Sequence, residues 1–282
     1  MKNRPFNRST DDIGNIISME HVNVTVPDQP LATLFYVNAL GFTRDPYVDF
    51  GRANIWINVG EQQFHLPTRS PQVLRGHVGV VVPDLNGLAQ RLESVARQLE
   101  DTRFSYRILK HRIDVSCPWG NRIRCYGPGQ FGTMKLGIPY VELDVPTGTS
   151  QGIARFYNEI LQAPATAADG RCTVAIGRGQ TLRFGETRRA IPEYDGHHIA
   201  IYVTNFSGPH AALERRGLIT EESDAHQYRF TTLVDPKSGK SLFELEHEVR
   251  SLFHPMYARP LTNRNPDQSF STYVKGRDAF VP

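Results

Sequence analysis

Histidine is the residue type through which this chain can do most of its chemistry. Ten histidines occur in 282 residues, and three of them open segments that read alike. Imidazole exchanges protons near neutral pH and is the commonest protein ligand of transition metals. His21, His77 and His198 open these segments, and Tyr140 opens a fourth. Whether these residues act together depends on the elements that position them, since they lie far apart in the chain.

The four segments predict the first strands of an internal repeat. They read HVNVTVPD from residue 21, HVGVVVPD from 77, YVELDVP from 140 and HIAIYVTN from 198. Alternating apolar and polar residues in three of them are typical of a strand with one face in a core. A helical pattern and then strand-like stretches follow each segment. The sequence therefore predicts βαβββ modules over residues 16–70, 75–128, 137–190 and 195–250, with a C-terminal extension over 251–282.

Alternation along the strands predicts which side chains share a face. The Val, Ile and Leu residues of the first strands face the helices, so the residues that open the four segments face the other way. The same rule turns one side chain of each last strand to that face: His65, Arg124, Arg183 and Glu244. One module cannot close alone. Two modules must therefore join their sheets edge to edge into a cup that these residues line.

This pattern resembles the vicinal oxygen chelate superfamily, which includes glyoxalase I and the extradiol dioxygenases. The resemblance rests on the four-fold repeat, the Phe-Tyr…Leu-Gly-Phe helix of the first module and the Gly-Asn-Arg-Ile turn of the second. It covers roughly residues 16 to 250. It implies an α+β fold of four tandem βαβββ modules that form two cup-shaped sheets. Such a fold hosts many reactions, so the resemblance alone does not name the activity.

The resemblance also implies a divalent metal held by first-strand histidines and a last-strand glutamate. Two imidazoles and one carboxylate leave about three positions for substrate and O₂. If module 1 joined module 2, Arg124 would share the cup of His21, and a cation repels a divalent metal. If module 1 joins module 4, one cup gathers His21, His65, His198 and Glu244. We favour the pairing of 1 with 4 and 2 with 3, and the pairing of 1 with 2 and 3 with 4 stays open.

Within the superfamily, the chain most resembles the hydroquinone ring-cleaving dioxygenases. That resemblance implies Fe(II) bound by His21, His198 and Glu244, with Zn²⁺, Ni²⁺, Co²⁺ or Mn²⁺ as alternatives. His65 or His226 would transfer protons, since an imidazole suits general acid–base catalysis. Tyr228 is the candidate for a tyrosine beside the metal. The expected substrate is a small dihydroxylated aromatic compound.

Two other functions stay open. In a glyoxalase-like isomerase or lyase, His65 would be a fourth ligand and the metal would act as a Lewis acid without redox chemistry. A metal-free protein would instead sequester a small molecule, as the bleomycin-binding members of the superfamily do. The cup of modules 2 and 3, with its arginines and aromatic residues, suits that function better.

Composition agrees with a folded chain that acts on small molecules. The formal net charge is +3, with 39% hydrophobic and 22% charged residues, which is typical of globular proteins. The basic residues are scattered, so we expect no nucleic-acid partner. No apolar run approaches the ~18 residues of a membrane span, and the polar N-terminus has no secretory h-region. We expect reduced cysteines and a cytoplasmic enzyme, and a homodimer stays open.

Overall fold

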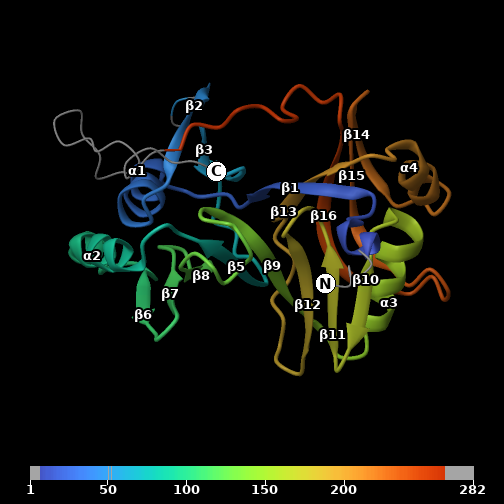
Figure 1. Ribbon diagram of the computed structural model, residues 1–282, viewed down its shortest axis with the longest axis horizontal. Coiled ribbons are helices and arrows are strands. Elements are labelled where there is room, and N and C mark those ends of the chain that lie inside the picture. The colour runs from blue at the N-terminus through green and yellow to red at the C-terminus, as the bar shows by residue number, and fades with distance from the viewer. Residues whose placement is uncertain (1–6, 50, 52, 264–282) are drawn as a thin grey trace, which may run out of the picture.

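The computed structural model describes residues 7–49, 51 and 53–263 of the chain. Four β-α-β-β-β modules follow one another, after a short 3₁₀-helix over Arg8–Asp11. Helices α1 and α2 lie at one end of the elongated molecule and α3 and α4 at the other, with the strands between them (Figure 1). The predicted fold of four tandem modules is confirmed.

The elements of each module have the following bounds. Module 1 consists of β1 (Ile16–Asn23), α1 (Gln29–Thr33) with the π-helix η2 (Leu34–Ala39), β2 (Thr43–Asp49), β3 (Asn54–Val59) and β4 (Gln62–Pro67). Module 2 consists of β5 (Gly76–Val81), α2 (Leu85–Val95) with η3 (Ala96–Leu99), β6 (Ser105–Ile108), β7 (Arg112–Ser116) and β8 (Arg122–Tyr126). Module 3 consists of β9 (Gly137–Pro146), α3 (Ser150–Phe156) with η4 (Tyr157–Leu161), β10 (Ala165–Ala168), β11 (Arg171–Ala175) and β12 (Thr181–Thr187). Module 4 consists of β13 (His198–Val203), α4 (Ser207–Glu214), β14 (Ile219–Asp224), β15 (Gln227–Val234) and β16 (Ser241–Ser251).

The strand order shows which modules join. Within the described residues, one eight-stranded sheet has the order β14-β15-β16-β13-β1-β4-β3-β2, and the other has the order β10-β11-β12-β9-β5-β8-β7-β6. Antiparallel pairing of β1 with β13 joins modules 1 and 4, and antiparallel pairing of β5 with β9 joins modules 2 and 3. The favoured pairing is therefore confirmed. We call the sheet of modules 1 and 4 the first cup and the sheet of modules 2 and 3 the second cup.

A single apolar core separates the two cups. Val22 and Phe64 of the first sheet belong to the same buried cluster as Val141 and Leu182 of the second. Burying such side chains supplies most of the free energy of folding, at about 1.5–3 kcal/mol each. The cup faces are the opposite faces of both sheets, so they point away from this core. Their polar side chains therefore lie outside this apolar cluster.

The C-terminal extension crosses the first cup from module 4 to module 1. Arg259 forms an ion pair with the buried Asp45, with 2.9 Å between Nη2 and Oδ2. Asn58 Nδ2 donates to the carbonyl of Thr262 at 2.9 Å, and Asn263 Nδ2 donates to the carbonyl of Gly60 at 2.8 Å. These contacts fix residues 259–263 of the extension against module 1. The rest of the predicted extension, residues 264–282, lies outside the described residues.

The cysteines and the helices agree with the sequence expectations. Cys117, Cys125 and Cys172 are buried free thiols, as expected. None of the helices in the described part of the chain is long and apolar enough to cross a bilayer.

Candidate metal centre

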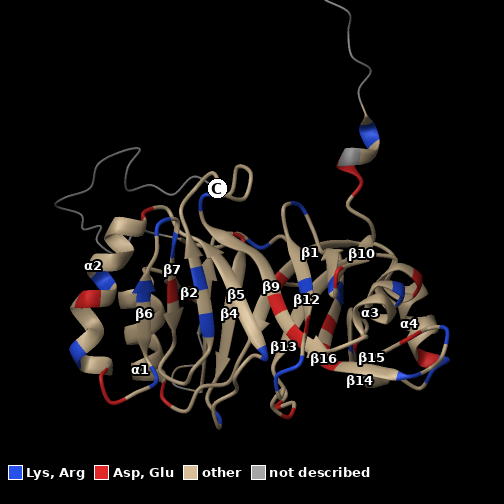
Figure 2. Cartoon of the chain, turned by 90° about the horizontal axis from the view of Figure 1, so that it is seen from below, with Lys and Arg blue, Asp and Glu red and all other residues tan. Residues whose placement is uncertain are grey.

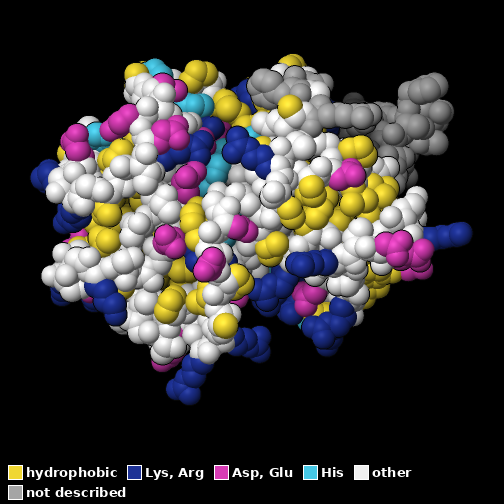
Figure 3. Space-filling model, turned by 180° about the vertical axis from the view of Figure 1, so that it is seen from behind, with side chains coloured by type: hydrophobic (Ala, Val, Ile, Leu, Met, Phe, Trp, Pro, Cys, Tyr) yellow, Lys and Arg dark blue, Asp and Glu magenta, His cyan; other side chains and the backbone are white. Residues whose placement is uncertain are grey.

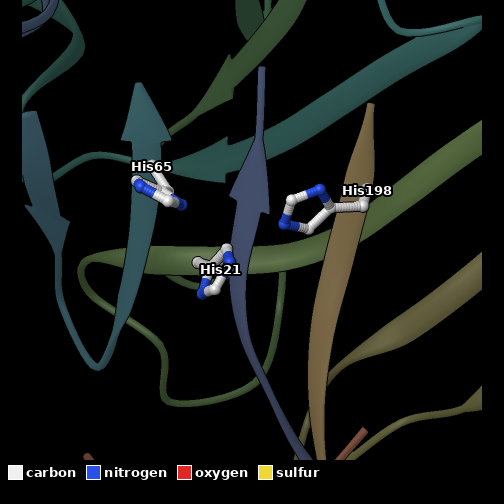
Figure 4. A group of neighbouring side chains, drawn as sticks. All are labelled: His21, His65 and His198. Carbon is white, nitrogen blue, oxygen red and sulfur yellow. The ribbon is translucent and has the colours of Figure 1, made fainter. Parts of the chain in front are cut away.

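Three histidines from three adjacent strands of the first cup converge. His21 lies on β1, His65 on β4 and His198 on β13, and each offers a nitrogen within 4.8 Å of those offered by the other two. Figure 4 shows the three rings turned toward one another across the cup face of the sheet. The centroids of the His21 ring and of the His65 and His198 rings are 5.4 and 5.7 Å apart. The sequence prediction that these side chains share one cup is confirmed.

The local structure of β1 brings two polar side chains to the site from consecutive positions. A register irregularity lies between Met19 and His21 where β1 pairs with β13. A bulge leaves one extra residue on its strand and re-aims the neighbouring side chains. Glu20 therefore lies beside His21, and its Oε2 is 3.0 Å from His21 Nδ1. Strict alternation would have placed Glu20 on the helix side of the sheet.

His65 is held by its neighbours on β3. The Trp56 ring stacks on the His65 ring with 3.9 Å between centroids, and it meets the His21 ring edge-on at 4.9 Å. Asn54 Nδ2 lies 2.7 Å from His65 Nε2. Both contacts fix the orientation of the imidazole, as residues that surround metal ligands commonly do.

Each of the three imidazoles keeps one nitrogen without a hydrogen-bond partner among the described residues. These buried atoms are His21 Nε2, His65 Nδ1 and His198 Nε2. Burial lowers the pKa of His65 to about 2, helped by the neighbouring imidazoles, and burial also lowers the pKa of His21. Both rings are therefore neutral at pH 7, and each carries one lone pair. Converging imidazoles fit a divalent transition metal, which binds the neutral form of the ring.

The carboxylate beside His21 determines which nitrogen this ring presents. Glu20 lies at Nδ1 of His21, whereas His198 has a carboxylate near each nitrogen, with Glu246 Oε1 3.3 Å from Nδ1. A carboxylate at Nδ1 of His21 favours the tautomer with the proton there, which leaves the lone pair on Nε2. Glu20 also accepts a hydrogen bond from the Tyr202 hydroxyl at 2.8 Å. Burial opposes the ionisation of Glu20, but His21 and the charge of Arg250 outweigh it and lower the pKa of Glu20.

Glu248 is the buried carboxylate closest to the free nitrogen of His198. It is 2% exposed, and its Oε2 lies 3.5 Å from His198 Nε2. Both of its oxygens form ion pairs, one with Arg229 and one with Arg250. Burial opposes ionisation, but His198, His21 and the two arginines lower the pKa of Glu248 far below its usual range. Glu248 is therefore ionised at neutral pH and neutralised by arginine.

Glu248 also occupies the position on module 4 that His65 occupies on module 1. His65 on β4 is aligned with Asn23 on the parallel strand β1, two residues after His21. Glu248 on β16 is aligned in the same way with Ala200 on β13, two residues after His198. The two modules thus offer equivalent pairs, His21 with His65 and His198 with Glu248. The sequence analysis predicts Glu244 instead of Glu248 as the last-strand residue of module 4 that faces the cup.

The structure does not bring Glu244 to the histidines. Glu244 is exposed, and its backbone carbonyl accepts a hydrogen bond from Arg75. It lies four residues before Glu248, a separation of about 13 Å along an extended strand. Glu244, Glu246 and Glu248 share one face because their spacing is even. Alternation could not choose among them, and only the register of β16 against β13 does so.

Tyr228 and His226 also lie apart from the histidine group. Tyr228 is buried on the helix side of β15, where its ring packs against Phe206 and His210 at 5.1 and 4.9 Å. His226 lies in the turn between β14 and β15, where its amide donates to Asp224. Tyr228 therefore does not lie beside the three histidines, contrary to the prediction for a tyrosine next to the metal. The residues that sequence reasoning missed are Glu20, Trp56, Tyr202, Arg229, Glu248 and Arg250.

A cavity of ≈ 730 Å³ lies beside Glu20, beneath the C-terminal extension. Ser18, Glu20, Gln63 and Tyr202 line it from the sheet, and residues 256–263 line it from the extension. Figure 3, which shows the face opposite to that of Figure 1, displays histidine side chains among acidic and basic ones in the upper part of the molecule. The cavity lies within the 300–1,000 Å³ usual for small-molecule sites. Glu20 connects it to His21.

Solved structures with this fold include a glyoxalase and a candidate dioxygenase. The chain matches glyoxalase I from Zea mays with a TM-score of 0.57 and 14% identity, over 83% of this chain and 92% of that chain. It matches a candidate dioxygenase from Bacillus subtilis with a TM-score of 0.54 and 13% identity, over 84% of this chain and 86% of that chain. No family model and no curated protein sequence matches the chain. The comparisons therefore establish a glyoxalase-type fold, and any function must be argued from the site.

Proposed function

We propose that this chain is a metal-dependent enzyme of the vicinal oxygen chelate superfamily and that it cleaves the ring of a dihydroxylated aromatic compound. The observation that carries the proposal is the convergence of three imidazoles, from His21, His65 and His198, each of which has one buried nitrogen without a hydrogen-bond partner among the described residues. Three protein ligands on one face of an ion leave about three positions open, as oxygenase sites require for substrate and O₂. Fe(II), when bound, would supply the redox chemistry with O₂.

In this proposal the third protein ligand is His65, whereas the sequence analysis predicts the carboxylate of Glu244. A proton carrier works best when its pKa is near the operating pH. A pKa of about 2 makes His65 unsuited to that role at neutral pH. We therefore propose His65 as a ligand, together with His21 and His198.

The residues around the histidines would position the substrate. Glu20 and Tyr202 line the cavity, and Tyr202 donates to Glu20. A substrate hydroxyl in this cavity can donate to the Glu20 carboxylate, which is ionised at neutral pH because of its lowered pKa. The extension over residues 256–263 covers the cavity and would exclude water from it.

A second candidate function is a glyoxalase-like isomerase or lyase. The observation that favours it is the equivalence of Glu248 and His65, since Glu248 could complete a set of four donors. Four protein ligands would leave about two positions, enough for two substrate oxygens but not also for O₂. We rank it second because Arg229 and Arg250 occupy both oxygens of Glu248.

Anaerobic purification followed by metal analysis and O₂-uptake assays tests the proposal. We expect about one equivalent of iron and O₂ consumption with a catechol or hydroquinone. The variants His21→Ala and His198→Ala should lose the metal, while His77→Ala in the second cup should keep it. Zinc or nickel without O₂ uptake would favour the isomerase. Failure to retain any divalent metal would refute both functions.

Glu248→Gln then separates the two candidates. If Glu248 only neighbours the ligands, its loss should weaken metal binding by about 10–100-fold, the usual effect of removing a residue that contacts a ligand. If it is a ligand, the loss should be larger. Trp56 reports binding by fluorescence, because it stacks on His65. A Trp119→Phe background leaves Trp56 as the sole tryptophan, since the chain has two.

A further inference from the structure

The second cup carries a different set of residues at the four positions that correspond to His21, His65, His198 and Glu248. The same alignment holds in both of its modules. Arg124 is aligned with Gly79, two residues after His77, and Arg183 is aligned with Glu142, two residues after Tyr140. The corresponding residues are His77, Arg124, Tyr140 and Arg183. Two guanidinium groups thus replace a histidine and a glutamate. These positions do not fit a divalent cation, and they favour a ligand of the opposite charge.

Tyr140 organises this cup. Its hydroxyl lies 3.2 Å from His77 Nε2 and 2.9 Å from the Tyr126 hydroxyl. The Arg183 guanidinium lies 4.0 Å from the centroid of its ring. The ring covers Gly79, where a Cβ atom would come within 2.2 Å of it. Glycine at that position therefore lets the aromatic ring lie flat across the floor of the cup.

Two positive charges of the cup are not neutralised by an ion pair. Within residues 7–49, 51 and 53–263, no carboxylate oxygen lies within 4.0 Å of the guanidinium of Arg124 or Arg183. Two other arginines of the same sheet do form ion pairs: Arg112 with Asp114 at 2.6 Å, and Arg122 with Asp144 at 3.0 Å. Figure 2 shows the charged positions along the central strands, among them β9 and β12.

Three other groups of this face affect its charge. Asp114 is aligned with Arg124 on the neighbouring strand, but it forms its ion pairs with Arg107 and Arg112. Glu142 is aligned with Arg183 on the neighbouring strand and shares its face, yet it forms no ion pair with it within 4.0 Å. Burial, together with Arg124, Arg122 and Arg183, lowers the pKa of His77 to about 3. His77 is therefore neutral at pH 7, and among the described residues neither Arg124 nor Arg183 has a carboxylate at ion-pair distance.

The cup has room for a ligand on both sides of these residues. A cavity of ≈ 280 Å³ is lined by His77 and Arg124, among others. A second cavity of ≈ 750 Å³ is lined by Arg183 and Phe131. The Phe131 ring lies 5.1 Å from Tyr126 and 5.8 Å from Tyr140, centroid to centroid. An aromatic surface therefore lies next to the Arg183 guanidinium, and Arg124 lines the other cavity.

We propose that the second cup binds a small aromatic carboxylate without any metal. Its carboxylate would be held between Arg124 and Arg183, because guanidinium groups bind carboxylates through paired hydrogen bonds. Its ring would pack against the half-buried rings of Tyr126 and Phe131, since the Tyr140 ring is itself buried. The site needs neither the first cup nor its metal, so it is independent of the proposed catalytic function.

Calorimetric titration of the full chain, treated with a chelator, tests this proposal. Benzoate is the probe, benzamide is its uncharged counterpart and inorganic phosphate is an anion without a ring. We expect benzoate to bind more tightly than either. Arg124→Gln and Arg183→Gln should each weaken benzoate binding about 10- to 100-fold, because each removes one charge-assisted contact. Arg97→Gln, an exposed position on the helix side of module 2, is the matched control and should change nothing.

Several results would overturn the proposal. Equal binding of benzamide and benzoate would show that the guanidiniums do not recognise charge, and equal binding of phosphate would show that the aromatic surface is not used. Benzoate binding that appears only after metal is added, or that is lost in Glu248→Gln but kept in Arg183→Gln, would place the probe in the first cup. Since the variants could fail to fold, circular dichroism accompanies each titration, and the three probes on the unmodified chain decide the question by themselves.

Discussion

Replacing Glu248 by Gln should destabilise the chain strongly, whereas the same change at Glu244 should not. Glu248 is buried and forms ion pairs with Arg229 and Arg250, whose side chains are 20% and 5% exposed. Removing one partner of a buried ion pair costs about 3–5 kcal/mol, because a charge remains without compensation. Arg229 keeps Glu246 and Arg250 keeps Glu20, so the lower end of that range, about 3 kcal/mol, is the expected loss.

Thermal and urea unfolding at pH 7 measure this loss in the metal-free chain. A loss of about 3 kcal/mol corresponds to a Tm lower by roughly 5–10 °C for a chain of this size. Glu244→Gln is the matched control, since its side chain is exposed and surface changes usually stay within about 0.5 kcal/mol. Equal unfolding free energies for the two variants would refute the assignment of Glu248 as the buried anion of the first cup.

The pH dependence gives a second check on the same variant. The pKa of Glu248 is lower in the folded chain than in the unfolded chain, so its stabilisation is present above its ordinary pKa and is lost as the pH falls through the folded value. The difference in stability between the parent chain and Glu248→Gln should therefore be full at pH 7 and should shrink below about pH 4.5. A difference that grows in acid would contradict the ion pairs.

Three further predictions concern residues outside the histidine group. Burial lowers the pKa of His247 to about 4, so as the pH falls this histidine takes up a proton in the unfolded chain before it does so in the folded chain. Between pH 7 and pH 5.5 the unfolding free energy of His247→Phe, measured by urea unfolding, should therefore fall by about 1 kcal/mol less than that of the parent chain. Arg259→Ala removes the partner of the buried Asp45, which should lower the unfolding free energy by about 1–3 kcal/mol and speed proteolysis of the extension; unchanged cleavage would contradict its fixed position. Tyr228→Phe removes a buried hydroxyl that has no partner among the described residues, so a thermal unfolding scan should show a Tm that is unchanged or higher, and metal titration an unchanged affinity.

The period of the strands predicted the composition of both cups. Alternation along β1, β4 and β13 turns His21, His65 and His198 to the face opposite the apolar side chains, because successive side chains of a strand point to opposite faces. The separation of histidines from arginines then favoured joining module 1 to module 4. Both conclusions depend on the periodicity of side chains and on charge, which a sequence displays directly.

The depth of each residue along its strand could not be predicted in the same way. Glu244 and Glu248 differ by four residues and are equivalent under alternation, so only the pairing of β16 with β13 separates them. The bulge that brings Glu20 beside His21 breaks alternation and leaves no signal in the composition of β1. Tyr228 is different, because applying alternation to β15 would have turned it, with Phe230, toward the helices.

Pairing of the first module with the last affects the order in which the protein can be completed during synthesis. All strands of the second cup have been made once β12 has emerged, whereas the first cup must wait for β16, roughly 60 residues later, or about 3–12 s at ribosomal rates of 5–20 residues/s. Until β13 has emerged, the edge of β1 that will pair with it has no partner, and unpaired strand edges invite aggregation. A nascent chain halted after module 3 would therefore contain all strands of the second cup together with only half of the first, so chaperone capture and aggregation during synthesis should act on module 1.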